Sequence, residues 1–182
     1  MADGRDLAAR EFLSALNSLV LGKPRSILMT LEAIKAAIPH REPFLLIDEI
    51  IEQEEERIVC RKTFNGDEFW YQGHYPNYPL TPGVLLCEAA MQAGAVMLST
   101  SGAARAAAGA AAGADVVPVA TRANNVQFKR MVRPGDTILI EVVLSERLAN
   151  AFFMKAKVTV AEKVALRFDF ACALAAAGRP DD

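Results

Sequence analysis

The residues best suited to chemistry in this chain are His74 and Glu88. His74 lies within QGHYPNYPLTPGV (residues 72–84), whose prolines and glycines exclude an ordinary helix or strand. Glu88 is the single acid in the apolar run VLLCEAAMQAGAVML (84–98). Histidine titrates near neutral pH and can accept or donate a proton, whereas a carboxyl group enclosed by apolar side chains resists ionisation. The two residues therefore indicate an acid–base site in which Glu88 is expected to be a protonated general acid.

Gly83 and Gln92 extend this candidate site along the run that contains Glu88. Gly83 lets a ligand approach the backbone, and unpaired N–H groups at a helix start favour developing negative charge, such as that of an enolate oxygen. Gln92 follows Glu88 by four residues, so the two share one helix face and Gln92 is expected to be a hydrogen-bonding support. Composition leaves other readings open: His74 as a turn or core residue, and Glu88 as a solvent-facing or arginine-paired acid.

The elements that must position these residues follow from the spacing of apolar side chains. Residues 44–64 contain two strands around the charged turn EQEEE, and 65–83 form a loop. Residues 84–98 are apolar on nearly every face, so that helix must be enclosed. Four further strands are expected at 116–130, 137–147, 151–160 and 164–174. This order predicts an α+β domain in which an antiparallel sheet wraps one central helix.

Two segments lie outside this pattern. Residues 1–25 have helical spacing and are interpreted as an N-terminal helical extension; a second helix at 26–37 then opens a single domain that runs to residue 178. Residues 101–115, SGAARAAAGAAAGAD, are of low complexity and are interpreted as an insertion without chemistry.

Composition excludes several classes of function. The net charge is −2, with 20 basic and 22 acidic residues, which argues against nucleic-acid binding. The apolar run around 84–98 is interrupted by Glu88 and Gln92 and falls short of the roughly 20 residues of a membrane span. The three cysteines, Cys60, Cys87 and Cys172, have no metal-ligand spacing and are expected to be reduced core thiols of a cytoplasmic protein that holds no metal.

Three separated motifs carry a resemblance to a known family. PHREPFLLID (39–48), QGHYPNYPLTPGVLLCEAAMQ (72–92) and FKRMVRPGD (128–136) resemble the FabZ-type β-hydroxyacyl-acyl-carrier-protein dehydratases, over roughly residues 30–176. The resemblance implies a hotdog fold and a homodimer with two active sites at its interface. The loop histidine of one subunit, here His74, would work with the helix glutamate of the other, here Glu88. Hexamers made of three dimers are common in the family.

The resemblance also implies a reaction, the loss of water from a (3R)-hydroxyacyl thioester. The substrate hangs on the phosphopantetheine arm of acyl carrier protein, and the enzyme uses no cofactor of its own. His74 would take the α-proton, protonated Glu88 would help the 3-hydroxyl leave, and the Gly83 N–H would polarise the thioester carbonyl. The remaining residues expected to bind substrate are Val84, Gln92, Tyr75 and Thr81.

This chain departs from the family pattern within the loop. Tyr75 stands where the family usually has phenylalanine, Asn77 where it has glycine, and Thr81 where it has methionine. Asparagine tolerates the left-handed conformation that a turn glycine needs. Thr81 bears on the preference for acyl chain length, because it is expected to line the site.

Other residues and functions complete the set of expectations. The basic cluster Lys129, Arg130 and Arg133 is expected either to dock the acidic carrier protein or to form a solvated turn. His40, in the PHR motif, is expected to be structural. The alternatives to a dehydratase are an (R)-specific enoyl-CoA hydratase, a thioesterase of the same fold, and a non-catalytic acyl-binding subunit.

Overall fold

The computed structural model describes residues 31–101 and 116–176. The expected N-terminal extension and the alanine-rich insertion fall outside these ranges. The described chain begins with α2 (Leu31–Ala37), the end of the helix expected at 26–37. A buried Ile34 anchors this short helix to the core.

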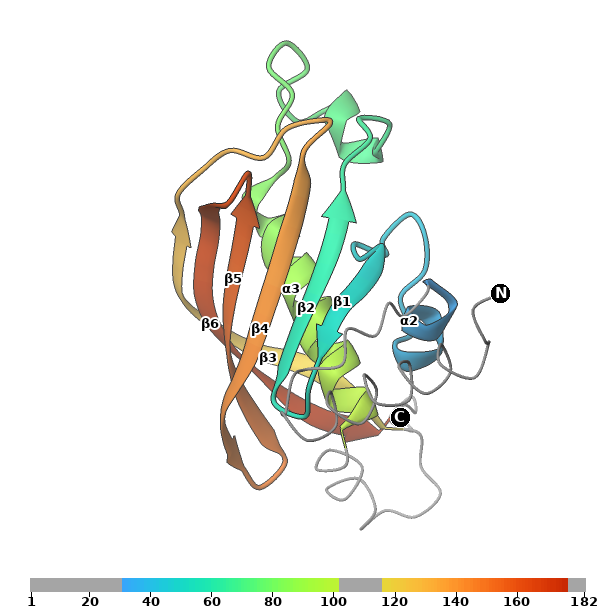
Figure 1. Cartoon of the computed structure of the whole chain (residues 1–182), viewed down its shortest axis with the longest axis vertical. Coiled ribbons are helices and arrows are strands. Elements are labelled where there is room, and N and C mark those ends of the chain that lie inside the picture. The colour runs from blue at the N-terminus through green and yellow to red at the C-terminus, as the bar shows by residue number, and fades with distance from the viewer. Residues whose placement is uncertain (1–30, 102–115, 177–182) are drawn as a thin grey trace, which may run out of the picture.

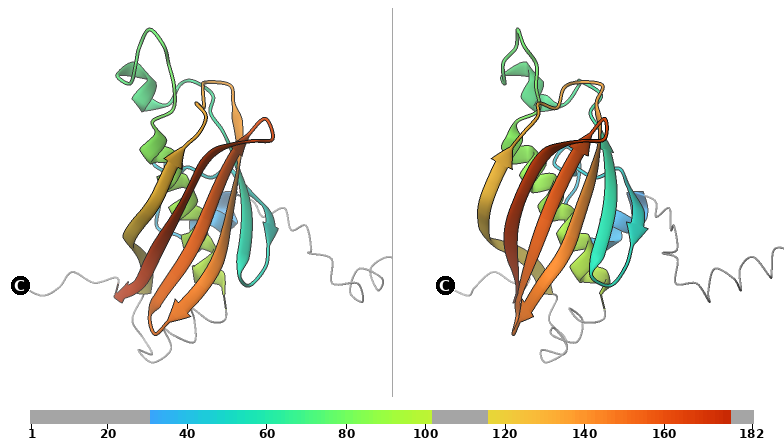
Figure 2. Two further views of the ribbon diagram at one scale, coloured as in Figure 1. Left: turned by 90° about the vertical axis from the view of Figure 1, so that its left-hand side faces the viewer. Right: turned by 60° about the vertical axis from the view of Figure 1, so that its left-hand side comes forward.

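One antiparallel sheet of six strands forms the body of the protein. The strands are β1 (Glu49–Gln53), β2 (Arg57–Thr63), β3 (Val116–Phe128), β4 (Thr137–Leu148), β5 (Ala151–Val160) and β6 (Lys163–Ala176). Their order across the sheet is β1-β2-β4-β5-β6-β3. The sheet curls around the long helix α3 (Gly83–Thr100), which lies against its concave side (Figures 1 and 2). The predicted α+β class and the enclosed central helix are both confirmed.

The core lies between α3 and the inner face of the sheet. In β5 the inward residues Phe152, Met154, Ala156, Val158 and Val160 are all buried, while their neighbours in sequence are more exposed. This alternation confirms the half-exposed strand expected at 151–160. By length and composition α3 could cross a membrane, but more than half of its residues are buried inside the fold, as in the core helix of a globular domain.

Two local predictions were wrong. The strand expected from residue 44 begins only at Glu49, because the backbone N–H of Leu46 donates to Gln92 Oε1 on α3 instead of joining a sheet ladder. The stretch at 65–83 is not all loop, since Phe69–Gln72 forms a turn of 3-10 helix, η1, that buries Trp70 and Tyr71. The first difference involves a contact between residues 46 positions apart, whereas η1 is closed by local hydrogen bonds such as that from Tyr71 N to Glu68 O.

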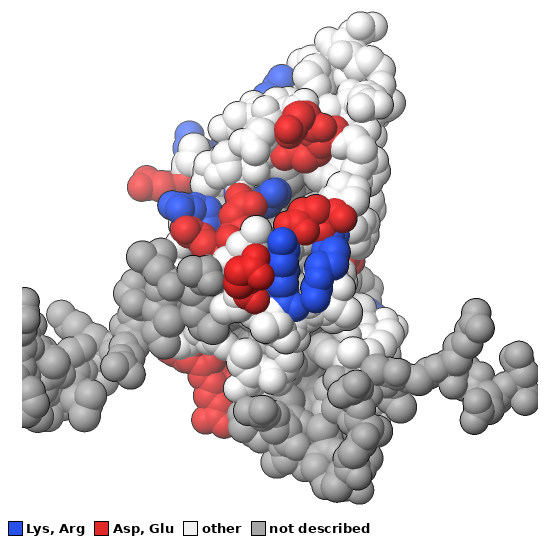
Figure 3. Space-filling model, turned by 90° about the vertical axis from the view of Figure 1, so that its right-hand side faces the viewer, with Lys and Arg blue, Asp and Glu red and all other residues white. Residues whose placement is uncertain are grey.

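Strand β3 occupies one edge of the sheet. Within the described ranges it pairs with β6 alone, although it is 13 residues long. Val119, Val126 and Phe128 on this strand are exposed apolar side chains. A long edge strand with apolar side chains is a template for pairing with another chain. Elsewhere on the surface, acidic and basic side chains are intermixed, as the face in Figure 3 shows.

Candidate active site

The loop after η1 holds His74 in a fixed place. The backbone N–H groups of Gly73 and His74 both donate to Trp70 O, at 3.1 and 2.7 Å. Tyr75 then takes a left-handed conformation with φ of 53°, so the chain turns sharply just after the histidine. The prediction placed such a turn at Asn77, but among the described residues of this loop Tyr75 is the one with positive φ.

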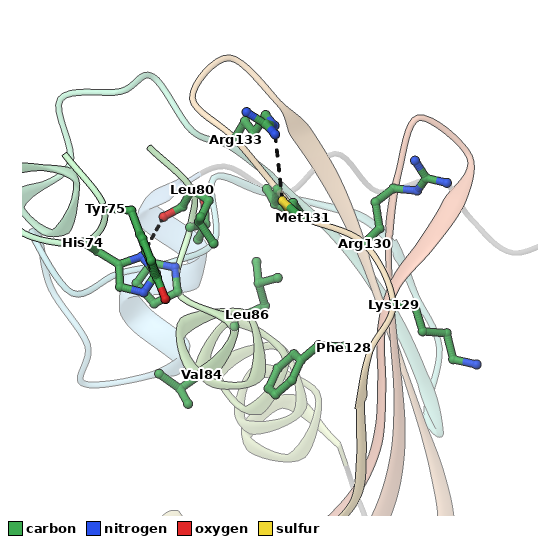
Figure 4. Close-up of a pocket in the computed structure, with 14 residues that line it drawn as sticks. His74, Tyr75, Leu80, Val84, Leu86, Phe128, Lys129, Arg130, Met131 and Arg133 are labelled. Carbon is green, nitrogen blue, oxygen red and sulfur yellow. Dashed lines mark hydrogen bonds between the residues drawn. The ribbon is translucent and has the colours of Figure 1, made fainter. Parts of the chain in front are cut away.

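One hydrogen bond sets the tautomer of His74. Nδ1 lies 3.0 Å from the carbonyl oxygen of Leu80, which can only accept, so Nδ1 carries the hydrogen and donates it. In the neutral imidazole Nε2 then keeps its lone pair. The ring lines a cavity of about 830 Å³ together with Gly83, Val84 and Phe128 (Figure 4). His74 is therefore oriented to act as a base at Nε2.

Gly83 begins α3 at the wall of the same cavity. Pro82 precedes it, and no side chain in the described part of the chain caps the helix start, so the first backbone N–H groups lack the usual side-chain acceptor there. A Cβ at residue 83 would lie 2.6 Å from the ring of Phe128. Phe128, the last residue of β3, is half-exposed, and the absence of a side chain at Gly83 admits this ring; close approach of a ligand to Gly83 remains a prediction.

Glu88 lies on α3 in a different cavity from His74. This second cavity has a volume of about 300 Å³ and is also lined by His40, Cys172 and residues 117–120 of β3. His74 and Glu88 share no hydrogen bond or ion pair within the chain as described. The structure therefore does not bring the two predicted catalytic residues together in one subunit.

The carboxyl group of Glu88 differs from the prediction. The His40 imidazole, followed by the amide of Gln92, holds the pKa of Glu88 below its usual range, although partial burial acts in the opposite direction. The side chain keeps 26% of its surface exposed, so desolvation is incomplete. Within the single subunit the lowered pKa favours the carboxylate form of Glu88 near neutral pH, whereas the sequence predicted a protonated Glu88.

Gln92 supports the site through side-chain hydrogen bonds to three other residues. It is buried, accepts from Leu46 N at 2.8 Å, and donates to Phe44 O at 2.8 Å and to Glu88 Oε1 at 2.9 Å. Its amide thus ties the segment before β1 to α3 and fixes one oxygen of Glu88. Sequence reasoning expected this support; a contact of Gln92 with substrate remains a prediction.

The other expected substrate-binding residues line the larger cavity in different ways. Thr81 is buried, and its hydroxyl lies 2.6 Å from that of Tyr71, while its N–H donates to Val132 O. Tyr75 and Val84 are exposed at the cavity mouth. Thr81 therefore ties the loop to Val132, in the segment before β4. Tyr75 and Val84 expose apolar surface beside the cavity.

The three basic residues of the expected docking cluster are not equivalent. In Figure 4 Lys129 and Arg130 point away from His74 and Val84, and both are exposed. The Arg133 guanidinium lies 4.3 Å from the centre of the Tyr78 ring, and it donates to the Tyr78 hydroxyl. Arg133 therefore ties the segment before β4 to the loop of His74, which leaves Lys129 and Arg130 as the more available cations.

Three features of the site were missed by sequence reasoning. These are the Phe128 ring over Gly83, the Arg133–Tyr78 contact, and the approach of His40 to Glu88. Each joins segments far apart in the chain, and no periodicity indicates such pairs. The PHR motif contains His40 and the FKR motif contains Phe128, but neither motif indicates which residue these side chains contact. Among the described residues no group of His, Cys, Asp and Glu is arranged to hold a metal ion.

Comparisons with known proteins agree with this arrangement. A model of the FabA-like domain family matches residues 38–169. A curated relative from Petrotoga mobilis, named 3-hydroxyacyl-[acyl-carrier-protein] dehydratase FabZ, is 37% identical over 75% of this chain and 91% of its own length. A protein of the same name from Staphylococcus carnosus is 42% identical over 70% of this chain and 82% of its own.

Solved structures share the architecture at low identity. A chain of the ApeI:P dehydratase heterocomplex from Xenorhabdus doucetiae has a TM-score of 0.61 at 15% identity, covering 79% of this chain and 91% of that one. An uncharacterised protein from Pyrococcus horikoshii has a TM-score of 0.54 at 18% identity, covering 83% and 93%. These likenesses show the hotdog fold. The chain belongs to the FabA-like family and, within it, to the FabZ-type dehydratases, which are hydro-lyases.

Proposed function

We propose that this chain removes water from a (3R)-hydroxyacyl thioester on the phosphopantetheine arm of acyl carrier protein, giving the trans-2-enoyl thioester for fatty acid synthesis. The observation that carries the proposal is the hydrogen bond from His74 Nδ1 to Leu80 O, which leaves Nε2 as a base inside a cavity that also contains the start of α3. The names of the curated relatives support the choice of substrate.

The chemistry begins at C2 of the substrate. His74 Nε2 takes the C2 proton, and the backbone N–H of Gly83 stabilises the negative charge that develops on the thioester oxygen. The electron pair then forms the C2–C3 double bond as the C3–O bond breaks. The departing hydroxyl takes the proton from the His74 imidazolium and leaves as water, so that no electrons are exchanged with a cofactor.

Glu88 acts in this scheme as a carboxylate. Because the pKa of Glu88 is lowered by His40, we assign it the task of accepting a hydrogen bond from the substrate 3-hydroxyl and holding that group beside C3. This replaces the general-acid role expected from the sequence. Glu88→Gln should then lose at least about 100-fold in kcat, because the amide cannot replace a carboxylate acceptor on both oxygens.

A homodimer is part of the proposal. The unpaired side of β3 and its exposed Val119 and Val126 suit pairing with a second copy, and the cavity of Glu88 lies against this same strand. Such pairing would bring Glu88 of one subunit to His74 of the other. Three such dimers would form a hexamer. The location that we propose is the cytoplasm, because the three cysteines are buried free thiols, as is usual in that reducing compartment.

Mixed dimers test the shared site. His74→Ala and Glu88→Gln chains, each inactive alone, are refolded or co-expressed together and assayed on a (3R)-hydroxyacyl carrier protein. If the two residues meet across the interface, random mixing restores about a quarter of wild-type activity, because half of the dimers contain one intact site of two. A mixture as inactive as its parents would contradict the shared site. Faster turnover of CoA thioesters than of carrier-protein thioesters by the wild type would favour a hydratase.

A further inference from the structure

The smaller cavity contains an arrangement around Glu88 that the proposed reaction does not explain. His40 Nε2 lies 3.5 Å from Glu88 Oε1, and both side chains line the cavity. The same oxygen, Oε1, accepts the hydrogen bond from Gln92. Within the described part of the chain Oε2 has no hydrogen-bond partner. The described residues thus contact the carboxylate through Oε1 alone, and Glu88 lines the cavity.

We propose that His40 is a positioning residue for Glu88, whose imidazole N–H at Nε2 orients the carboxylate so that Oε2 faces the substrate hydroxyl. This inference rests on the proposed role of Glu88. The separation of 3.5 Å is longer than the 2.7–3.2 Å of a good hydrogen bond, so a small rotation of either side chain is needed to close it. Catalytic hydrogen bonds are often long before substrate binds.

The backbone of His40 is well fixed. Arg41 donates through one guanidinium nitrogen to Ile38 O at 2.9 Å and to His40 O at 2.6 Å. Ile38 is itself buried and continues α2 through its hydrogen bond to Ile34 O. The imidazole therefore projects from an anchored turn, as a positioning residue must.

The other ring nitrogen of His40 selects the tautomer. Nδ1 is buried and has no hydrogen-bond partner among residues 31–101 and 116–176. A hydrogen placed on Nδ1 would be a buried donor without an acceptor, which is more costly than a lone pair left without a donor. The hydrogen of the neutral ring therefore belongs on Nε2, where it points at Glu88.

The remaining titratable group around Glu88 is poorly suited to do this work. Cys172, on β6, lines the same cavity, but burial first and the Glu88 charge second raise the pKa of its thiol to about 12. The thiol is therefore neutral at working pH. Residues 117–120 of β3 present apolar side chains, and Gln92 is uncharged. Among the described titratable side chains that line this cavity, His40 is the one in contact with the Glu88 carboxylate.

The titration of Glu88 tests the proposal directly. In full-length protein with ¹³C-labelled glutamate side chains, the Glu88 carboxyl signal is assigned by its loss in Glu88→Gln, and its midpoint is followed with pH. His40→Phe, which keeps a ring but no donor, should move the midpoint to higher pH and lower kcat by about 10- to 100-fold, with KM less affected. His40→Gln, which restores an N–H donor, should recover most of both. An unchanged midpoint and kcat in His40→Phe would overturn the proposal.

Two measurements separate the possible failures. If Glu88→Gln keeps full activity, the proposed function of Glu88 is wrong, while the midpoint shift still reports whether His40 acts on it. If His40→Phe does not fold, ¹⁵N shifts of the wild-type imidazole decide. Hydrogen on Nε2 supports the proposal and hydrogen on Nδ1 overturns it.

Discussion

The ring of Phe128 lies against Gly83 so closely that a Cβ there would come within 2.6 and 2.8 Å of two ring carbons. The last residue of the edge strand β3 thus packs on the first residue of α3, at the wall of the cavity that contains His74. The identity of residue 83 and the position of this ring are therefore coupled.

We expect Gly83→Ala to displace Phe128 into the cavity and lower kcat/KM by at least about tenfold. Stability should change by less than about 1 kcal/mol, because the half-exposed ring can swing away and alanine favours the helix. In the double variant Gly83→Ala/Phe128→Ala the obstruction is gone, and kcat/KM should recover towards that of Phe128→Ala alone. A double variant no better than Gly83→Ala would show that the loss has another cause.

Gly94 makes a second close approach, this time in the core. A Cβ there would lie 2.8 Å from Phe170 Cζ and 3.1 Å from Met154 Sδ, both buried on the inner face of the sheet. Gly94→Ala should therefore lower the free energy of unfolding by about 1–3 kcal/mol, despite the better helix propensity of alanine. Adding Phe170→Leu should return part of this loss. Gly73→Ala is the control and should leave the urea midpoint unchanged, because a Cβ there would meet no described atom within 4 Å beyond its chain neighbours.

Much of this fold was predictable from local pattern, but the site only in part. The alternation in 151–160 and the enclosed helix at 84–98 need only neighbouring residues, and both predictions are confirmed. The place of β3 beside β6, at the sheet edge, depends on how strands far apart in sequence pair. The late start of β1 also depends on a residue far along the chain, because Leu46 N donates to the Gln92 side chain and not to a neighbouring strand. The lowered pKa of Glu88 could not be foreseen, since it depends on His40 reaching it from another segment.

The hydroxyl groups of Tyr71 and Thr81 lie 2.6 Å apart and are both buried. Thr81→Val would leave the Tyr71 hydroxyl without that partner and should lower the free energy of unfolding by about 1–3 kcal/mol. Thr81→Ser keeps the hydroxyl and should cost less. In the double variant Tyr71→Phe/Thr81→Val neither hydroxyl remains, so its stability, measured by urea unfolding, should exceed that of Thr81→Val. A double variant that is less stable by the sum of the two single losses would mean that the hydroxyls do not interact.

Arg130 and Arg133 offer a test of where an acidic carrier protein docks. Arg130→Glu should raise KM for a carrier-protein substrate by about tenfold and leave turnover of the matching pantetheine thioester unchanged, because that small substrate carries no charge whereas the carrier protein presents an acidic surface. Arg133→Glu should lower kcat on both substrates, since it breaks the contact with Tyr78 that ties down the His74 loop. Arg147→Glu, at the far end of β4, is the charge-matched control. Equal effects of the Arg130 and Arg147 reversals on KM, or an Arg133 effect confined to the carrier-protein substrate, would contradict this division of roles.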